Sequence, residues 1–370
     1  MEPTGAGPAE AALLCACARR RAQDSALPPT TSLNVDWDAV LRAADAHAVT
    51  ELLTAPLKSR ATHVPPQVMA HLQQRSVEVT SQNLGRITEL IDVLTLLTTA
   101  GIRALTFKGP TLAAAYGHIG RRRSSDLDIF VARRDVSRVR PLLLSRGYRI
   151  PPQARWRGDS LLYGLLPAAG RSDTLLPSHP KQSMIDVHVA FAAWRYDIRI
   201  DTRSLFDRAV AVEVAGRALP TLCPDDLLLV LAIHGMTHAW GNLRLISDID
   251  AVAEWVTDWN VVITRAEAAG MRRILCVALL LSHRVLGTDL PPAVLARASA
   301  DAGAVQLTDD AVARLFDAHA GPNPRQRAWL RSFLDTPRRR ATFVVRDTIH
   351  EWFLLWPWNT AFTRRTTTRD

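Results

Sequence analysis

Two short stretches of the sequence place acidic side chains where they could act together. Asp126 and Asp128 are separated by one apolar residue, and so are Asp186 and His188. Successive side chains of a β-strand point to opposite faces, so each pair would share one face, with the first two carboxylates about 7 Å apart. Like charges at this distance raise each other's pKa unless a cation compensates them. Mg²⁺, which prefers carboxylate oxygens, is the natural compensation.

A third carboxylate would complete this site if the two strands are neighbours. Asp186 would then join Asp126 and Asp128 in a triad able to hold two metal ions, which neutralise a triphosphate and lower the pKa of an attacking hydroxyl. Lys108 and Gly109 precede the first pair, at the start of a predicted helix. The alternative is a half-exposed sheet face whose aspartates bind no metal.

The hydrophobic pattern predicts the elements that position these residues. Apolar side chains at three- and four-residue spacing predict a long helix over residues 66–100, ended by Gly101. Short apolar runs then predict a small α/β unit. Its strands are predicted over 103–107, 127–131 and 184–191, its helices over 110–116 and 135–145, and a candidate hairpin strand over 161–166.

Helices are predicted on both sides of this unit. Two short ones lie within residues 35–57, after a Gly/Pro/Ala-rich start of ten residues that we expect to be disordered. The later helices are predicted over 225–238, 243–259, 265–286, 293–301, 308–319 and 325–334. The Trp-rich segment 352–358 is interpreted as a helix or strap docked on the core. The fold class is therefore α+β, a small mixed β-sheet core flanked by N-terminal and C-terminal helical regions.

Composition narrows the function classes. The net charge is +9, but only three of the 45 basic residues are lysines, so nucleic acid is a possible partner that is not favoured. The longest apolar stretches, 227–233 and 274–281, are too short to span a membrane. The apolar segment 11–18 precedes three arginines, the reverse of a secretory signal, so we expect a cytoplasmic protein with reduced cysteines. The motifs of P-loop enzymes and serine hydrolases are absent from the sequence.

The order of the motifs resembles the DNA polymerase β-type nucleotidyltransferase superfamily. It runs from Lys108-Gly109 through a helix with Tyr116, then Arg122, then the two acidic strands. Within the superfamily the chain is most similar to an uncharacterised bacterial nucleotidyltransferase-like family that accompanies peptide natural-product biosynthesis genes. The helical block 233–248 is also similar to that family, and the resemblance covers residues 84–259.

The resemblance implies transfer of a nucleoside monophosphate from an NTP such as ATP to an acceptor, with release of pyrophosphate. It implies that Asp126 and Asp128 bind both metals, Mg²⁺ or Mn²⁺, and that Asp186 holds the metal that activates the acceptor. Lys108, Gly109 and Arg122 would bind the triphosphate. Supporting roles are open to four residues: His188, His234, His238 and Arg244. The acceptor is open too, as a small molecule, a peptide, a protein or an RNA end.

The chain divides into three predicted parts under this interpretation. Residues 1–85 form an N-terminal helical lobe with a disordered start, 86–215 the nucleotidyltransferase core, and 216–370 a C-terminal helical domain. Two side features complete the prediction. His234 and His238 share a helix face, but Gly235 stands where a zinc protease has glutamate, so zinc is not favoured. Arg244 and Asp248, four residues apart, are interpreted as a helix-surface pair.

A second function remains open because of Pro110. Superfamily members carry serine or glycine at this position, whereas proline offers a phosphate neither a hydroxyl nor an N–H. The alternative is a catalytically degenerate nucleotidyltransferase fold, acting as a nucleotide sensor or protein-interaction partner in a biosynthetic pathway. The three aligned aspartates favour the enzyme.

Overall fold

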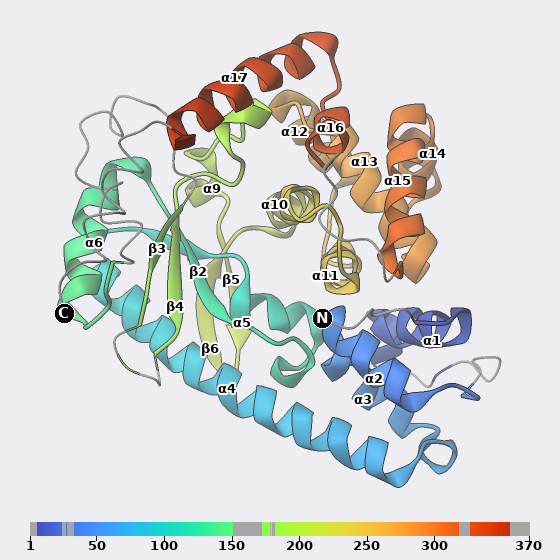
Figure 1. The fold of residues 1–370 in the computed structure, drawn as a ribbon. Helices are drawn as coiled ribbons and strands as arrows, with labels where there is room; N and C mark the ends of the chain where they lie inside the picture. The colour runs from blue at the N-terminus through green and yellow to red at the C-terminus, as the bar shows by residue number, and fades with distance from the viewer. Residues whose placement is uncertain are drawn as a thin grey trace.

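A mixed β-sheet with helices on both sides organises the chain (Figure 1). The computed structural model describes residues 6–23, 27, 33–150, 172–177, 179, 182–317 and 326–355. The sheet has six strands in the order β3-β4-β2-β1-β6-β5. Their bounds are β1 Ala104–Thr106, β2 Asp126–Val131, β3 Ser172–Leu175, β4 Met184–His188, β5 Val210–Val214 and β6 Arg217–Thr221. The α+β fold class is confirmed.

Pairing within the sheet decides where the acidic strands lie. β2 runs parallel to β4 and antiparallel to β1, and β1 runs parallel to β6. The predicted strands are confirmed in β1, β2 and β4, although β4 ends at His188 rather than at residue 191. The β5–β6 hairpin was not predicted, because its exposed positions leave little apolar pattern. The candidate strand at 161–166 lies outside the described residues.

One face of the sheet is covered by α4, which spans Pro66–Thr99 (Figure 1). Ile87, Leu90 and Leu94 of α4 pack in one core cluster with Leu127 and Ile129 of β2. The helix ends as predicted: its C-cap is Ala100, followed by a glycine with φ +70° that donates its N–H to the helix. Because the apolar residues of β2 face α4, Asp126 and Asp128 point to the opposite face.

That opposite face belongs to a second, larger core. Phe107 and Phe130 pack there with Phe191 and with helix α10, Pro224–Thr237. α11, Leu243–Ala253, packs against α10. The acidic side chains therefore lie between the sheet and the C-terminal helices.

The other helices surround these two cores. Their bounds are α1 Pro8–Ala18, α2 Trp37–Ala46, α3 Thr50–Lys58, α5 Gly109–Leu112, α6 Val136–Ser145, α9 Ser204–Asp207, α12 Trp259–Ala269, α13 Arg272–Leu281, α14 Pro292–Ser299, α15 Ala302–Leu315, α16 Gln326–Ser332 and α17 Pro337–Leu355. The two predicted short helices within 35–57 are confirmed as α2 and α3. The predicted helices over 243–259 and 265–286 are wrong in their limits, since α11 ends at Ala253 and Gly270, at φ +70°, separates α12 from α13.

The chain ends bear on two predictions, of which one is wrong. The expected disorder of the first ten residues is wrong from Pro8 onward, where proline begins α1 and Leu13 and Leu14 are buried. The Trp-rich segment begins inside α17, and residues 356–358 lie outside the described part.

The three-part division of the chain stays a prediction. Its first border falls inside α4 and its second in the turn between β5 and β6, so the second and third parts both contribute strands to the sheet. Among the described helices, none is both long and apolar enough to span a membrane.

Candidate active site

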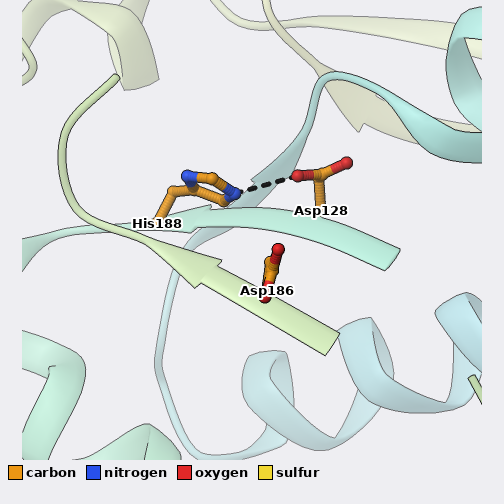
Figure 2. A group of neighbouring side chains, drawn as sticks. All are labelled: Asp128, Asp186 and His188. Atoms are coloured by element: carbon orange, nitrogen blue, oxygen red, sulfur yellow. Dashed lines mark hydrogen bonds and ion pairs between the residues drawn. The ribbon is translucent and has the colours of Figure 1, made fainter. Parts of the chain in front are cut away.

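The acidic residues meet because β2 and β4 are parallel neighbours. Asp128 pairs with Asp186 in the register, and Asp126 pairs with Met184. The two strands that carry the acidic residues are therefore adjacent, as the triad requires. Possible ligand atoms of Asp128, Asp186 and His188 all lie within 4.8 Å of one another, and Figure 2 shows the three side chains on the same side of the two strands. We refer to these three residues as the ligand group.

Asp128 is held ionised inside this group. It is 3% exposed, and its Oδ1 lies 3.0 Å from Nζ of Lys108 and 2.9 Å from Nε2 of His188 (Figure 2). Burial alone would raise the pKa of Asp128, but the hydrogen bond from His188 and the charge of Lys108 outweigh it and hold that pKa well below its usual value. Asp128 thus presents a fixed negative charge.

His188 orients Asp128 from the same strand as Asp186. Its ring packs edge-on against Phe107 at 5.0 Å between centroids, which sets the ring plane. Its Nδ1 is buried and has no hydrogen-bond partner.

Asp126 and Asp186 complete the acidic surface. Burial, followed by repulsion from Asp128, raises the pKa of Asp126, while Lys108 opposes the shift. Asp186 keeps one carboxylate oxygen buried without a hydrogen-bond partner. A buried acceptor left unpaired costs about 1–3 kcal/mol, which a cation at this point would recover. Carboxylate oxygens suit Mg²⁺ or Mn²⁺, so Asp128 and Asp186 fit a divalent metal, while Nε2 of His188 bonds to Asp128.

The turn between β1 and α5 lies against the start of β2. Gly109 has φ +60°, and a Cβ there would lie 3.0 Å from the carbonyl oxygen of Asp126. Glycine is therefore needed for both the backbone conformation and the close approach. This turn places Lys108 over Asp128.

Arg122, which the resemblance assigned to the triphosphate, lies in a buried ion pair. Its Nε and Nη2 donate to Oδ1 and Oδ2 of Asp248 at 2.7 and 2.9 Å, and its Nη1 donates to the carbonyl oxygen of Gly109 at 3.2 Å. Tyr116 donates its hydroxyl to the same carboxylate at 2.7 Å. In this arrangement Arg122 positions the Gly109 turn, and contact with a triphosphate would require the pair to open.

Asp248 corrects one interpretation and adds a site residue that the sequence analysis missed. The predicted helix-surface pair of Arg244 and Asp248 is wrong, because Asp248 is 1% exposed and pairs with Arg122 instead. Burial alone would raise the pKa of Asp248, but the charge of Arg122 outweighs it and lowers that pKa. An acidic residue between Ile246 and Ile249, in a helix this apolar, was the available signal.

The remaining predicted residues approach from the helical side. The rings of His234 and His238 lie 4.5 Å apart. Burial, followed by the charge of Lys108, lowers the pKa of His234 well below its usual value, so this ring is neutral. In the part of the chain that the structure describes, neither histidine belongs to a group of three potential metal ligands. Arg244 lies one helical turn before Asp248, with a buried Nε that has no hydrogen-bond partner.

Comparison with known proteins identifies the family of this chain. A family model described as an uncharacterised nucleotidyltransferase matches residues 34–287. The chain belongs to that family of nucleotidyltransferases. A solved structure, an antigenic nucleotidyltransferase-like protein from Paracoccidioides brasiliensis, aligns at 14% identity and a TM-score of 0.38, over 59% of this chain and 99% of its own. The curated proteins contain no match.

Proposed function

We propose that the protein is a metal-dependent nucleotidyltransferase that moves a nucleoside monophosphate from an NTP to an acceptor. One observation carries the proposal: Asp128 and Asp186 face each other across parallel strands, with a buried Asp186 oxygen that has no partner. Membership of the family supports it. The NTP, the acceptor and the metal are part of the proposal.

Each acidic residue has a distinct proposed role. Asp126 and Asp128 would bind both metal ions, and Asp186 would bind the one nearer the acceptor. Bound Mg²⁺ or Mn²⁺ would supply charge neutralisation for the triphosphate and a lower pKa for the acceptor hydroxyl. His188 keeps Asp128 oriented and ionised through its 2.9 Å hydrogen bond.

The transfer itself exchanges one phosphorus–oxygen bond for another. The acceptor oxygen bonds to the α-phosphorus, the bond from that phosphorus to the bridging oxygen breaks, and pyrophosphate leaves. Asp186 would take the proton of the acceptor hydroxyl. Nζ of Lys108 lies 3.0 Å from Oδ1 of Asp128. Its ammonium group would therefore contact a triphosphate bound to the metal ions that Asp128 holds. Gly109 would bring its backbone close to the phosphates.

A nucleotide sensor or protein-interaction partner without catalysis is the second candidate. Two observations favour it. Pro110 supplies no N–H to a phosphate, and the donors of Arg122 are occupied by Asp248 and Gly109. Such a protein would bind Mg²⁺ and an NTP but release no pyrophosphate.

Label transfer separates the two candidates. The protein would be incubated with Mg²⁺ or Mn²⁺, each α-labelled NTP, and small-molecule, peptide, protein and RNA fractions of a lysate. We expect label to move to one fraction with wild-type protein, and to be lost in Asp128→Asn and Asp186→Asn. Asp92→Asn, an exposed change on α4, is the matched control and should transfer normally.

The outcome assigns the function directly. Wild-type rates in Asp128→Asn or Asp186→Asn would contradict the metal-site assignment. Nucleotide binding without label in any fraction would favour the sensor.

A further inference from the structure

Arg244 lies in the first turn of α11, on the side of that helix that faces the candidate active site. Asp248, four residues later, shares this side, because residues four apart are neighbours on a helix surface. Its carboxylate accepts two hydrogen bonds from Arg122, whose Nη1 donates to the carbonyl oxygen of Gly109 at 3.2 Å. α11 also packs against the turn Ala113–Tyr116, which follows α5. This side of α11 therefore faces the turn between β1 and α5.

The guanidinium of Arg244 has no hydrogen bond or ion pair within the described part of the chain. Its backbone N–H donates to the carbonyl oxygen of His47 at 3.2 Å, which fixes the start of the helix. Nε is buried without an acceptor, but the residue is only half-buried, so Nη1 and Nη2 are not enclosed. An arginine keeps its charge in proteins, and a buried charge is costly unless it is paired. The group is thus accessible to an anion and lacks one.

The charges around Arg244 favour an additional anion. Burial, followed by repulsion from Arg122, lowers the pKa of Arg244, while Asp248 and, more weakly, Asp126 oppose the shift. The carboxylate of Asp248 is already occupied by Arg122 and by the hydroxyl of Tyr116. A ligand with several negative charges would therefore stabilise Arg244 where the protein itself does not.

The turn between β1 and α5 indicates which ligand brings these charges. Lys108 in this turn lies 3.0 Å from Asp128, so a triphosphate held by metal ions at Asp128 would lie along the turn. The resemblance assigned that triphosphate to Arg122, but the donors of Arg122 are taken by Asp248 and Gly109. Arg244 lies on the same side of α11 as this pair, and its guanidinium is unoccupied.

We propose that Arg244 binds the terminal phosphates of the nucleotide, in the role that the resemblance gave to Arg122. The proposal rests on the nucleotidyltransferase function proposed above, because it deepens the donor side of the same site. Arg122 then keeps its bonds to Asp248 and Gly109 and positions the turn. The planar guanidinium of Arg244 matches a phosphate group, which can accept two parallel N–H bonds.

Calorimetry with tripolyphosphate tests the proposal, because this probe carries the phosphates of every NTP and no base. Full-length protein with Mg²⁺ would be titrated with tripolyphosphate and, separately, with the α,β-methylene analogues of ATP, GTP, CTP and UTP. Arg244→Met removes the charge, and Arg244→Lys keeps it without the planar fork. Arg217→Met is the control, at an exposed position of β6, on the far side of β1 from the acidic strands. Mn²⁺ affinity without nucleotide and thermal unfolding would be measured alongside.

We expect wild type and Arg217→Met to bind the same probes with equal affinity. Arg244→Met should bind them about tenfold more weakly or worse, because it loses charge-assisted hydrogen bonds. Arg244→Lys should recover part of this loss. Neither the Mn²⁺ affinity nor the melting temperature of Arg244→Met should fall, because the change touches no proposed metal ligand and removes a charge that has no partner.

Three results would overturn the proposal and leave the proposed function intact. They are equal affinity of Arg244→Met for the probes, no recovery in Arg244→Lys, and a fall in Mn²⁺ affinity or melting temperature in Arg244→Met, which would make Arg244 structural. Wild-type protein that binds none of the probes would instead contradict the nucleotidyltransferase function, and the role of Arg244 would fall with it.

Discussion

Removing the carboxylate of Asp248 should destabilise the protein more than any exposed change. Arg122 is 6% exposed and Asp248 1% exposed, and the carboxylate accepts two hydrogen bonds from Arg122 and one from Tyr116. Asp248→Ala leaves a guanidinium and a phenol buried, with only Gly109 still accepting from Arg122. Breaking a buried ion pair from one side costs about 3–5 kcal/mol of unfolding free energy.

The expected fall in melting temperature follows from the chain length. At about 2.1 cal/mol/K of unfolding entropy per residue, a chain of 370 residues that unfolds as one unit loses about 4–6 °C for this destabilisation. The low pKa of Asp248 also gives the sign of the pH dependence. Its contribution is complete above the unfolded pKa of about 3.9 and is lost as pH falls below it.

Urea denaturation at pH 7 would compare wild type, Asp248→Ala, Arg122→Met and the double variant, with exposed Asp92→Ala as control. The double variant should be more stable than the sum of its single changes predicts, because it leaves no unpaired charge. A loss below about 1 kcal/mol in Asp248→Ala, or strict additivity, would refute the reasoning.

Four further predictions concern single groups. Burial lowers the pKa of His47 to about 4, and one of its ring nitrogens accepts a backbone N–H. Between pH 6.5 and 4 the unfolded chain therefore binds a proton at His47 that the folded protein does not, so the free energy of unfolding falls as pH drops through that window. Asparagine keeps a hydrogen-bond acceptor but does not titrate. Between pH 7 and pH 4.5, urea denaturation should therefore show a smaller loss of unfolding free energy for His47→Asn than for wild type, by on the order of 3 kcal/mol. Equal losses would contradict a buried neutral ring. Asp128→Asn should abolish Mn²⁺ binding in calorimetry and also lower the melting temperature, because the neutral amide leaves Lys108 without its buried charged partner; retained Mn²⁺ affinity would dismiss the site. Asp186→Asn should bind nucleotide more nearly normally yet transfer far more slowly, because an amide accepts no proton; transfer at full rate would refute its role. The purified protein should lack zinc; stoichiometric zinc in elemental analysis that disappears in His234→Ala, but not in Asp186→Asn, would show that His234 and His238 ligate metal.

The sequence was sufficient for the features with a strong periodic pattern. Alternation in the strands put Asp126 and Asp128 on one face, because side chains alternate in any strand. The three- and four-residue spacing of apolar side chains predicted α4, and Gly101 its end. The family resemblance rested on the same short motifs, and the matching family model agrees with it.

Weak local patterns explain the failures in the fold. The hairpin of β5 and β6 lies at a sheet edge with exposed positions, so it carries little periodicity. The helices predicted over 243–259 and 265–286 were wrong in their limits because apolar residues continue across the short connections, whereas Asp258 caps the start of α12 and Gly270 its end.

Only the tertiary structure decided how the charged residues pair. Arg122 and Asp248 are 126 positions apart, and nothing local distinguishes a triphosphate ligand from a buried partner of a distant helix. Asn83 and Glu89 carried no motif either, and only the structure shows that their partners lie just before β2 and β4. Periodicity reports which face of its own element a side chain occupies. The packing of distant elements determines what that side chain meets, because burial and pairing are properties of the assembled core.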